Sequence, residues 1–182
     1  MSSPQSFEQA IEASHRALDE ITRGNPEPFF GLYSRSEDAT LANPYGPPAR
    51  GFDEIEAAGR RAAANYHDGK AVGFETFAKF ATAELGYTLE IERFEAKVAG
   101  ADEISPVALR VTSVYRREQS GWRLLHRQAD PITAPRSGDS VIQSEATRER
   151  SGTNGCWVGP CPQTSPLADS PAQPARGALA VR

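Results

Sequence analysis

Apolar residues recur first at helical spacing and later at every second position, so the chain predicts helices followed by strands. Residues 7–21 carry an amphipathic helical repeat, with a start signal at Ser3-Pro4 and a stop signal at Gly24. A short helical segment is expected over 27–34, with three aromatic residues on its apolar side. The N-terminal part is therefore predicted to be helical.

Alternating patterns dominate the segment that follows. Asp53 is expected to cap one further helix that runs to about Tyr66, where His67-Asp68-Gly69 end it. The expected strands span residues 38–43, 72–82, 85–98, 106–118 and 122–130. This order predicts an α+β fold, in which a curved antiparallel sheet and the N-terminal helices enclose a pocket.

The last two strands are expected to form a hairpin through the loop Gln119-Ser120-Gly121, with the glycine in the left-handed conformation. The expected register places Glu118 opposite Trp122, Thr112 opposite Gln128 and Arg110 opposite Asp130. A slip by one residue would change every pairing and would turn each side chain to the other face.

The final strand carries an unusual polar series. His126, Gln128 and Asp130 stand two residues apart, so they share one face of a regular strand, and the same spacing adds Trp122 and Leu124 to that face. Burying three polar groups beside apolar surface costs free energy unless they find partners or a ligand. The pattern therefore predicts a functional site at this strand.

Four segments resemble SnoaL-like members of the NTF2-like superfamily. They are DATLANPYGP (38–47), RGFDEI (50–55), LRVT (109–112) ahead of RRE (116–118), and GWRLLHR (121–127). The resemblance covers about residues 6–134. It implies a cone-shaped, ketosteroid-isomerase-like fold, commonly dimeric through the sheet face, with a cavity that opens toward the N-terminal helices. The superfamily includes isomerases, cyclases, hydratases, epoxide hydrolases and non-catalytic binding domains, so the fold alone does not define a function.

Asp130 is the candidate general base, because a carboxylate at the edge of an apolar cavity has its pKa raised by desolvation. The alternative is a structural ion pair with Arg110 across the hairpin. His126 is a candidate proton shuttle or hydrogen-bond donor, or else a core histidine satisfied by a neighbour. Related sequences often carry His-x-His where this chain has His126-x-Gln128, and an amide cannot act as a base near neutral pH.

The predicted substrate-binding residues surround this pair of candidates. They are Gln128, Thr112, Asn43, Phe30, Tyr33 and Tyr66, and Tyr45 is a further possible cavity phenol. Glu90, Glu92 and Arg93 are expected to face solvent. The ligand is expected to be an apolar small molecule with one or two polar groups. The two hypotheses are a cofactor-free isomerase or cyclase-type enzyme and a non-catalytic ligand-binding or dimerisation module.

Composition and charge argue against several classes of protein. The chain has 182 residues and a formal net charge of -4, with no basic run suited to nucleic acid, no apolar run long enough for a membrane span and no signal-peptide pattern. We therefore expect a cytoplasmic protein, and the resemblance to SnoaL-like proteins implies a homodimer. No phosphate loop, dinucleotide fingerprint or metal-ligand spacing is present, so no cofactor or metal is predicted.

Composition changes near Arg136, so one domain is predicted over 1–136 and a disordered Ser/Gly/Pro-rich tail over 137–182. The tail holds Cys156 and Cys161, whose spacing fits neither a redox motif nor a zinc set.

Overall fold

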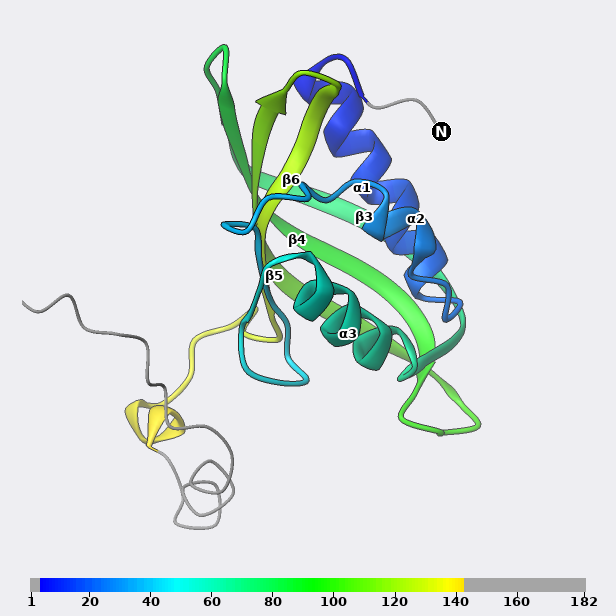
Figure 1. Ribbon diagram of the computed structural model, residues 1–182. Coiled ribbons are helices and arrows are strands. Elements are labelled where there is room, and N and C mark those ends of the chain that lie inside the picture. The colour runs from blue at the N-terminus through cyan, green and yellow to red at the C-terminus, as the bar shows by residue number, and fades with distance from the viewer. Residues whose placement is uncertain (1–3, 143–182) are drawn as a thin grey trace, which may run out of the picture. The chain divides into compact units, whose positions relative to one another are not determined.

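A curved, unclosed six-stranded sheet carries the fold, and helices lie across its concave side (Figure 1). The computed structural model describes residues 4–142. The elements there are α1 (Phe7–Ile21), α2 (Glu27–Phe30), β1 (Thr40–Ala42), β2 (Ala49–Arg50), α3 (Phe52–Ala63), β3 (Tyr66–Ala81), β4 (Leu85–Val98), β5 (Ile104–Glu118) and β6 (Gly121–Asp130). The strand order is β2-β1-β6-β5-β4-β3, and the β1–β6 pair is parallel while the other pairs are antiparallel. The predicted α+β class is confirmed.

The chain divides after Ser137 into two units, Met1–Ser137 and Gly138–Arg182. The described part of the second unit holds a single turn of 3-10 helix, Gly138–Val141. The tail predicted to be disordered falls mostly on residues 143–182, which lie outside the described residues, as do Cys156 and Cys161.

Helix α1 ends at Ile21, as the stop signal predicts, but it begins at a capping box rather than at Ser3-Pro4. The hydroxyl of Ser6 accepts from the amide of Gln9 at 3.2 Å, and the side chain of Gln9 accepts from the amide of Ser6 at 3.3 Å. These two bonds satisfy donors that the first helical turn leaves unpaired. The helix buries Ala10, Ile11, Ala17 and Leu18 against the sheet side of the core.

Helix α3 differs from its prediction at both ends. Its N-cap is Gly51 rather than Asp53, and it ends at Ala63, so that Tyr66 already begins β3. The segment that was predicted to end the helix, His67-Asp68-Gly69, belongs to this strand. Gly69 has no Cβ, which lets the strand pass very close to two backbone carbonyls. A Cβ at Gly69 would lie 2.6 Å from the oxygen of Thr22 and 2.7 Å from that of Glu95.

The β5–β6 register changes at a single extra residue. Thr112 pairs with Gln128 and Arg110 with Asp130, as predicted, but beyond Val114 and His126 the pairing shifts, so that Glu118 faces Gly121 rather than Trp122. Leu125 is the residue left without an opposite partner, which is the pattern of a β-bulge.

The bulge lies where β6 changes its neighbour on the other edge. Leu124 bonds to the chain at 32–34: its amide donates to the carbonyl of Leu32 and its carbonyl accepts from Ser34. From His126 onward β6 pairs instead with β1. Because one extra residue reverses the alternation of side chains, Arg127 and Ala129 share the inner face with Trp122 and Leu124. The predicted shared face for His126, Gln128 and Asp130 with the two apolar residues is therefore wrong.

The side chains of β4 that face the helices are not the ones expected. A Cβ on Gly86 would meet the ring of Phe7 in α1 at 2.7 Å, so Gly86 faces the helices. By alternation Glu90 and Glu92 also face inward, and both are buried, whereas Leu85 and Tyr87 face outward. The expectation that both glutamates face solvent is wrong, and it holds only for Arg93, which is exposed.

We expect Gly69→Ala to destabilise the protein by about 1–3 kcal/mol, because the added methyl group would contact rigid backbone oxygens rather than a movable side chain. Gly73→Ala is the matched control on the same strand, since a Cβ there meets nothing within 4 Å. Urea unfolding of the full chain measures both, and the control is expected to change stability by no more than about 0.5 kcal/mol. Equal effects of the two substitutions would contradict the close packing at Gly69.

Candidate functional site

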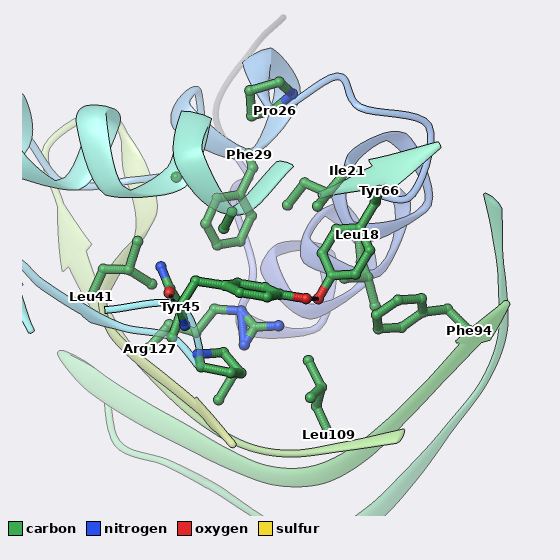
Figure 2. A pocket seen from close by; sticks show the side chains of 15 residues that line it. Leu18, Ile21, Pro26, Phe29, Leu41, Tyr45, Tyr66, Phe94, Leu109 and Arg127 are labelled. Carbon is green, nitrogen blue, oxygen red and sulfur yellow. Dashed lines mark hydrogen bonds between the residues drawn. The ribbon is translucent and has the colours of Figure 1, made fainter. Parts of the chain in front are cut away.

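A cavity of about 60 Å³ lies between the helices and the inner face of the sheet (Figure 2). Most of its wall is apolar and comes from the following residues: Leu18, Ile21, Pro26, Phe29, Leu41, Pro44, Gly59, Ala62, Phe94, Leu109 and Ala129. The polar residues on the wall are Asn43, Tyr45, Tyr66 and Arg127. This combination of apolar walls with a few polar groups is typical of a small-molecule site.

Arg127 is the charged residue of the cavity wall, and only 7% of it is exposed. Its Nη2 donates to Glu92 Oε2 at 2.5 Å, and its guanidinium lies 5.7 Å from the ring centre of Phe29. Its Nη1 is buried and has no hydrogen-bond partner among residues 4–142. An unpaired buried donor on a charged group is costly, because the water that it has lost is not replaced.

Glu92 reaches Arg127 from β4. Burial raises the pKa of Glu92, and the nearby charge of Arg127 opposes that rise without cancelling it. The pair is nearly excluded from solvent on both sides, at 8% and 7% side-chain exposure. The charge of Arg127 is therefore balanced locally, and its unpaired Nη1 is what remains for a further partner.

Two tyrosines close one side of the cavity. The hydroxyl of Tyr45 donates to that of Tyr66 at 2.7 Å, and Figure 2 shows the two side chains meeting at their ends. Burial is the main cause that raises the pKa of Tyr66 far above its usual value, so its hydroxyl stays protonated. The amide of Tyr45 donates to the side-chain oxygen of Asn43 at 2.9 Å, which fixes the loop that carries this residue.

The other predicted cavity aromatics lie in the core. Phe30 packs against α3, where a Cβ on Gly59 would come within 2.5 Å of its ring. Tyr33 is 1% exposed, packs edge-on against Phe29 at 5.2 Å, and has a hydroxyl without a partner among the described residues. Burial raises the pKa of Tyr33 far above its usual range. Of the eight predicted site residues, Tyr66 and Asn43 line the cavity.

The remaining four predicted site residues lie on the opposite face of the sheet. Asp130 accepts from Arg110 at 2.9 Å, and Gln128 is exposed opposite Thr112. The Nδ1 of His126 lies 2.8 Å from the hydroxyl of Thr40, and burial lowers the pKa of this imidazole. Their proposed roles stay predictions, but chemistry at these side chains would take place outside the cavity.

A second polar cluster ties α1 to the sheet. His15 stacks on Phe74 with ring centres 3.6 Å apart, and its Nε2 lies 3.2 Å from Glu90 Oε2. Thr76 donates to the other oxygen of Glu90 at 2.9 Å. Burial alone would raise the pKa of Glu90, but the bonds from His15 and the threonines outweigh it and lower that pKa.

Arg127 and Glu92 were not among the site residues predicted from the sequence. A usable signal for Glu92 was present, because Leu89 and Ile91 place apolar residues on one face of the strand while Phe94 places a large aromatic on the other. With apolar residues on both faces of the strand, neither face can be assigned to solvent by its charges alone, and a glutamate that is buried there needs a partner. Nothing comparable marks the bulge that turns Arg127 inward.

Several solved structures share this architecture. The matches include a structure from Thiobacillus denitrificans named as a candidate calcium/calmodulin-dependent protein kinase type II association domain, with a TM-score of 0.60, 22% identity, and coverage of 73% of this chain and 99% of that one. An NTF2-like superfamily protein from Salmonella enterica matches with a TM-score of 0.58, 15% identity and coverage of 72% and 92%. A ketosteroid isomerase-like protein from Erwinia carotovora matches with a TM-score of 0.57, 17% identity, and coverage of 70% of this chain and 95% of that one. No family model and no curated protein matches the chain.

The chain is therefore an α+β protein with a curved sheet and a helix-covered concave face. Its fold is that of the NTF2-like proteins, and the resemblance seen in the sequence is confirmed at the level of the fold. At these identities the likeness defines the fold and leaves the chemistry to the site.

Among residues 4–142, no helix is both long and apolar enough to cross a membrane. No group of three or more His, Cys, Asp or Glu side chains in that part of the chain is arranged to hold a metal ion.

We expect Arg127→Met to destabilise the protein by about 3–5 kcal/mol, because it leaves Glu92 buried without its cation. Adding Glu92→Gln should recover most of that loss. In the single variant the folded-state pKa of Glu92 lies above its unfolded value, so the folded state binds more protons between the two values. Its stability deficit should therefore shrink as pH falls through that window.

Urea unfolding at several pH values measures the stability of the original full chain, the two single variants and the double variant. The double variant should lack the pH-dependent part, because it has no titrating group at position 92. Additive effects of the two substitutions at every pH would contradict a coupled buried pair.

Proposed function

We propose that this protein binds a small, mainly apolar molecule in the cavity lined by Tyr45, Tyr66 and Arg127. The observation that carries the proposal is the buried Nη1 of Arg127, which lies on the wall of an apolar cavity without a partner among residues 4–142. Leaving such a donor unsatisfied costs about 1–3 kcal/mol or more, and an acceptor atom of a ligand would remove that cost. The apolar walls would bind the rest of the molecule.

The cavity limits the size of the ligand. At about 60 Å³ it exceeds the space that one water molecule occupies, and it suits a molecule of a few heavy atoms. A larger ligand would require the hydrogen bond between Tyr45 and Tyr66 to open. Since Tyr45 is 40% exposed, this side of the cavity is where a ligand would enter.

A binding module accounts for the observed contacts better than catalysis by Asp130. A general base must reach the proton that it removes, and Asp130 is paired with Arg110 on the face away from the cavity. An enzyme that acts through Asp130 would need its substrate on that outer face, which also carries His126. Its requirement is a substrate that displaces Arg110 from Asp130.

We expect Ala62→Leu to weaken ligand binding at least tenfold, because Ala62 lines the cavity and a larger side chain would fill it. Ala57→Leu is the matched control, since Ala57 lies on the exposed side of the same helix. Ligand-detected NMR with small ketones and alkenes, such as acetone and isobutene, measures binding to the full chain of each variant. Equal binding by Ala62→Leu and the original chain would show that the cavity is not the site.

We also propose that two copies of this chain associate through the outer face of the sheet. Phe80 on β3 is 58% exposed and packs beside Tyr87 on β4, with ring centres 6.4 Å apart. Leu85 adds a further exposed apolar side chain on the same face. Adjacent exposed apolar side chains are typical of interaction sites, and a two-fold axis would let this strip cover itself.

Sedimentation velocity tests the association. The original chain is expected to sediment as a dimer, and Tyr87→Lys should shift it to the monomer because it buries a charge in the contact. Ala64→Lys is the control, since Ala64 is exposed at the end of α3. A monomeric original chain would rule out this dimer.

A further inference from the structure

We propose that the cavity selects uncharged molecules that carry a carbonyl-type oxygen, and that Glu92 is the residue that excludes carboxylates. This inference rests on the proposed binding function and names its ligand class. It follows from the types of polar groups that face the cavity and from the charges directly behind them.

The free polar groups on the cavity wall are hydrogen-bond donors. The free group of Arg127 is Nη1, which can only donate. The hydroxyl of Tyr66 already accepts from Tyr45, so its own proton is what it has left to offer. A ligand oxygen that accepts hydrogen bonds therefore matches both groups, whereas a ligand amine or ammonium group would meet donors.

The positive charge on the cavity wall is already paired. Glu92 holds Nη2 of Arg127 at 2.5 Å in a setting almost free of solvent, so the cationic charge is already neutralised. Glu90 brings a second buried carboxylate to the inner face of β4, where it contacts His15. A carboxylate bound at Nη1 of Arg127 would thus bring additional negative charge close to the buried carboxylate of Glu92, and interactions between charges are strong where solvent is excluded.

The free-energy cost of binding differs between an uncharged ligand and a carboxylate. A ketone, ester or amide would satisfy Nη1 with its carbonyl oxygen and would leave the Arg127–Glu92 pair unchanged. A carboxylate would have to lose its own hydration and repel Glu92, or else bind together with a proton taken up by the pair. The uncharged acceptor is therefore the ligand class that fits the cavity.

Three probes of similar size separate the effects of shape, hydrogen bonding and charge: acetone, isobutene and acetate. Dissociation constants for the full chain are measured by NMR titration at pH 7.5. We expect the ketone to bind at least tenfold more tightly than the alkene of the same shape, and at least tenfold more tightly than the carboxylate. Equal binding of the ketone and the alkene would overturn the role of Arg127 and leave the apolar cavity as a binding site. Failure of all three probes to bind would overturn the cavity function as well.

Glu92→Gln provides the decisive variant, because it removes the neutralising charge and keeps the side-chain shape. We expect it to reverse the preference, so that the carboxylate binds at least tenfold more tightly than it does to the original chain and more tightly than the ketone. Glu95→Gln is the matched control on the same strand, since Glu95 pairs with exposed Lys70 on the outer side. An unchanged preference in folded Glu92→Gln would overturn the proposal.

The original chain supplies an independent readout if Glu92→Gln folds poorly. Ketone binding should release or take up no protons, whereas any carboxylate binding should take up about one proton per ligand. Calorimetry in two buffers of different ionisation enthalpy measures this number. Carboxylate binding that is tighter than ketone binding and takes up no proton would contradict the exclusion by Glu92.

Discussion

The β-bulge at Leu125 decides which residues of the last strand meet the cavity. Its single extra residue exchanges the two faces of β6, so Arg127 points inward and His126 points outward. The bulge lies where Leu124 stops bonding to the chain at 32–34 and His126 starts pairing with β1. The bulge therefore interrupts the alternation of side chains where β6 exchanges one neighbour for the other, as bulges do where they redirect a side chain.

Turning Arg127 inward brings its own requirement. A guanidinium inside a core needs a counter-charge, and Glu92 on the central strand β4 provides one across the intervening strand β5. Buried ion pairs gain little stability over apolar packing, because desolvation offsets most of the attraction. The pair therefore makes better sense as a binding device than as a stabilising one, since it presents one free donor, Nη1, without a net charge.

Much of the fold could be predicted from periodicity. The strand over 85–98 is confirmed. The pairing of Arg110 with Asp130 is confirmed as well, because the third loop residue assumed at the hairpin offsets the extra residue at Leu125 in the register. The inner face could not be predicted in the same way, because alternation holds only until a bulge interrupts it. Glu92 was misplaced for a different reason: a charged residue on a strand is usually exposed, and nothing in the sequence marked Arg127 as its buried partner.

The separation of the two faces also divides the two functional hypotheses. A ligand on Arg127 and a substrate on Asp130 would lie on opposite sides of one sheet, so neither could use groups from both sides. Substitutions at Glu92 or Ala62 should affect the cavity and leave Asp130 and Arg110 paired. Changes at Asp130 should leave the Arg127–Glu92 pair intact, because the backbone of β6 lies between the two sets of side chains. The faces can therefore be tested independently, and activity lost only by outer-face variants would place the chemistry beyond the cavity.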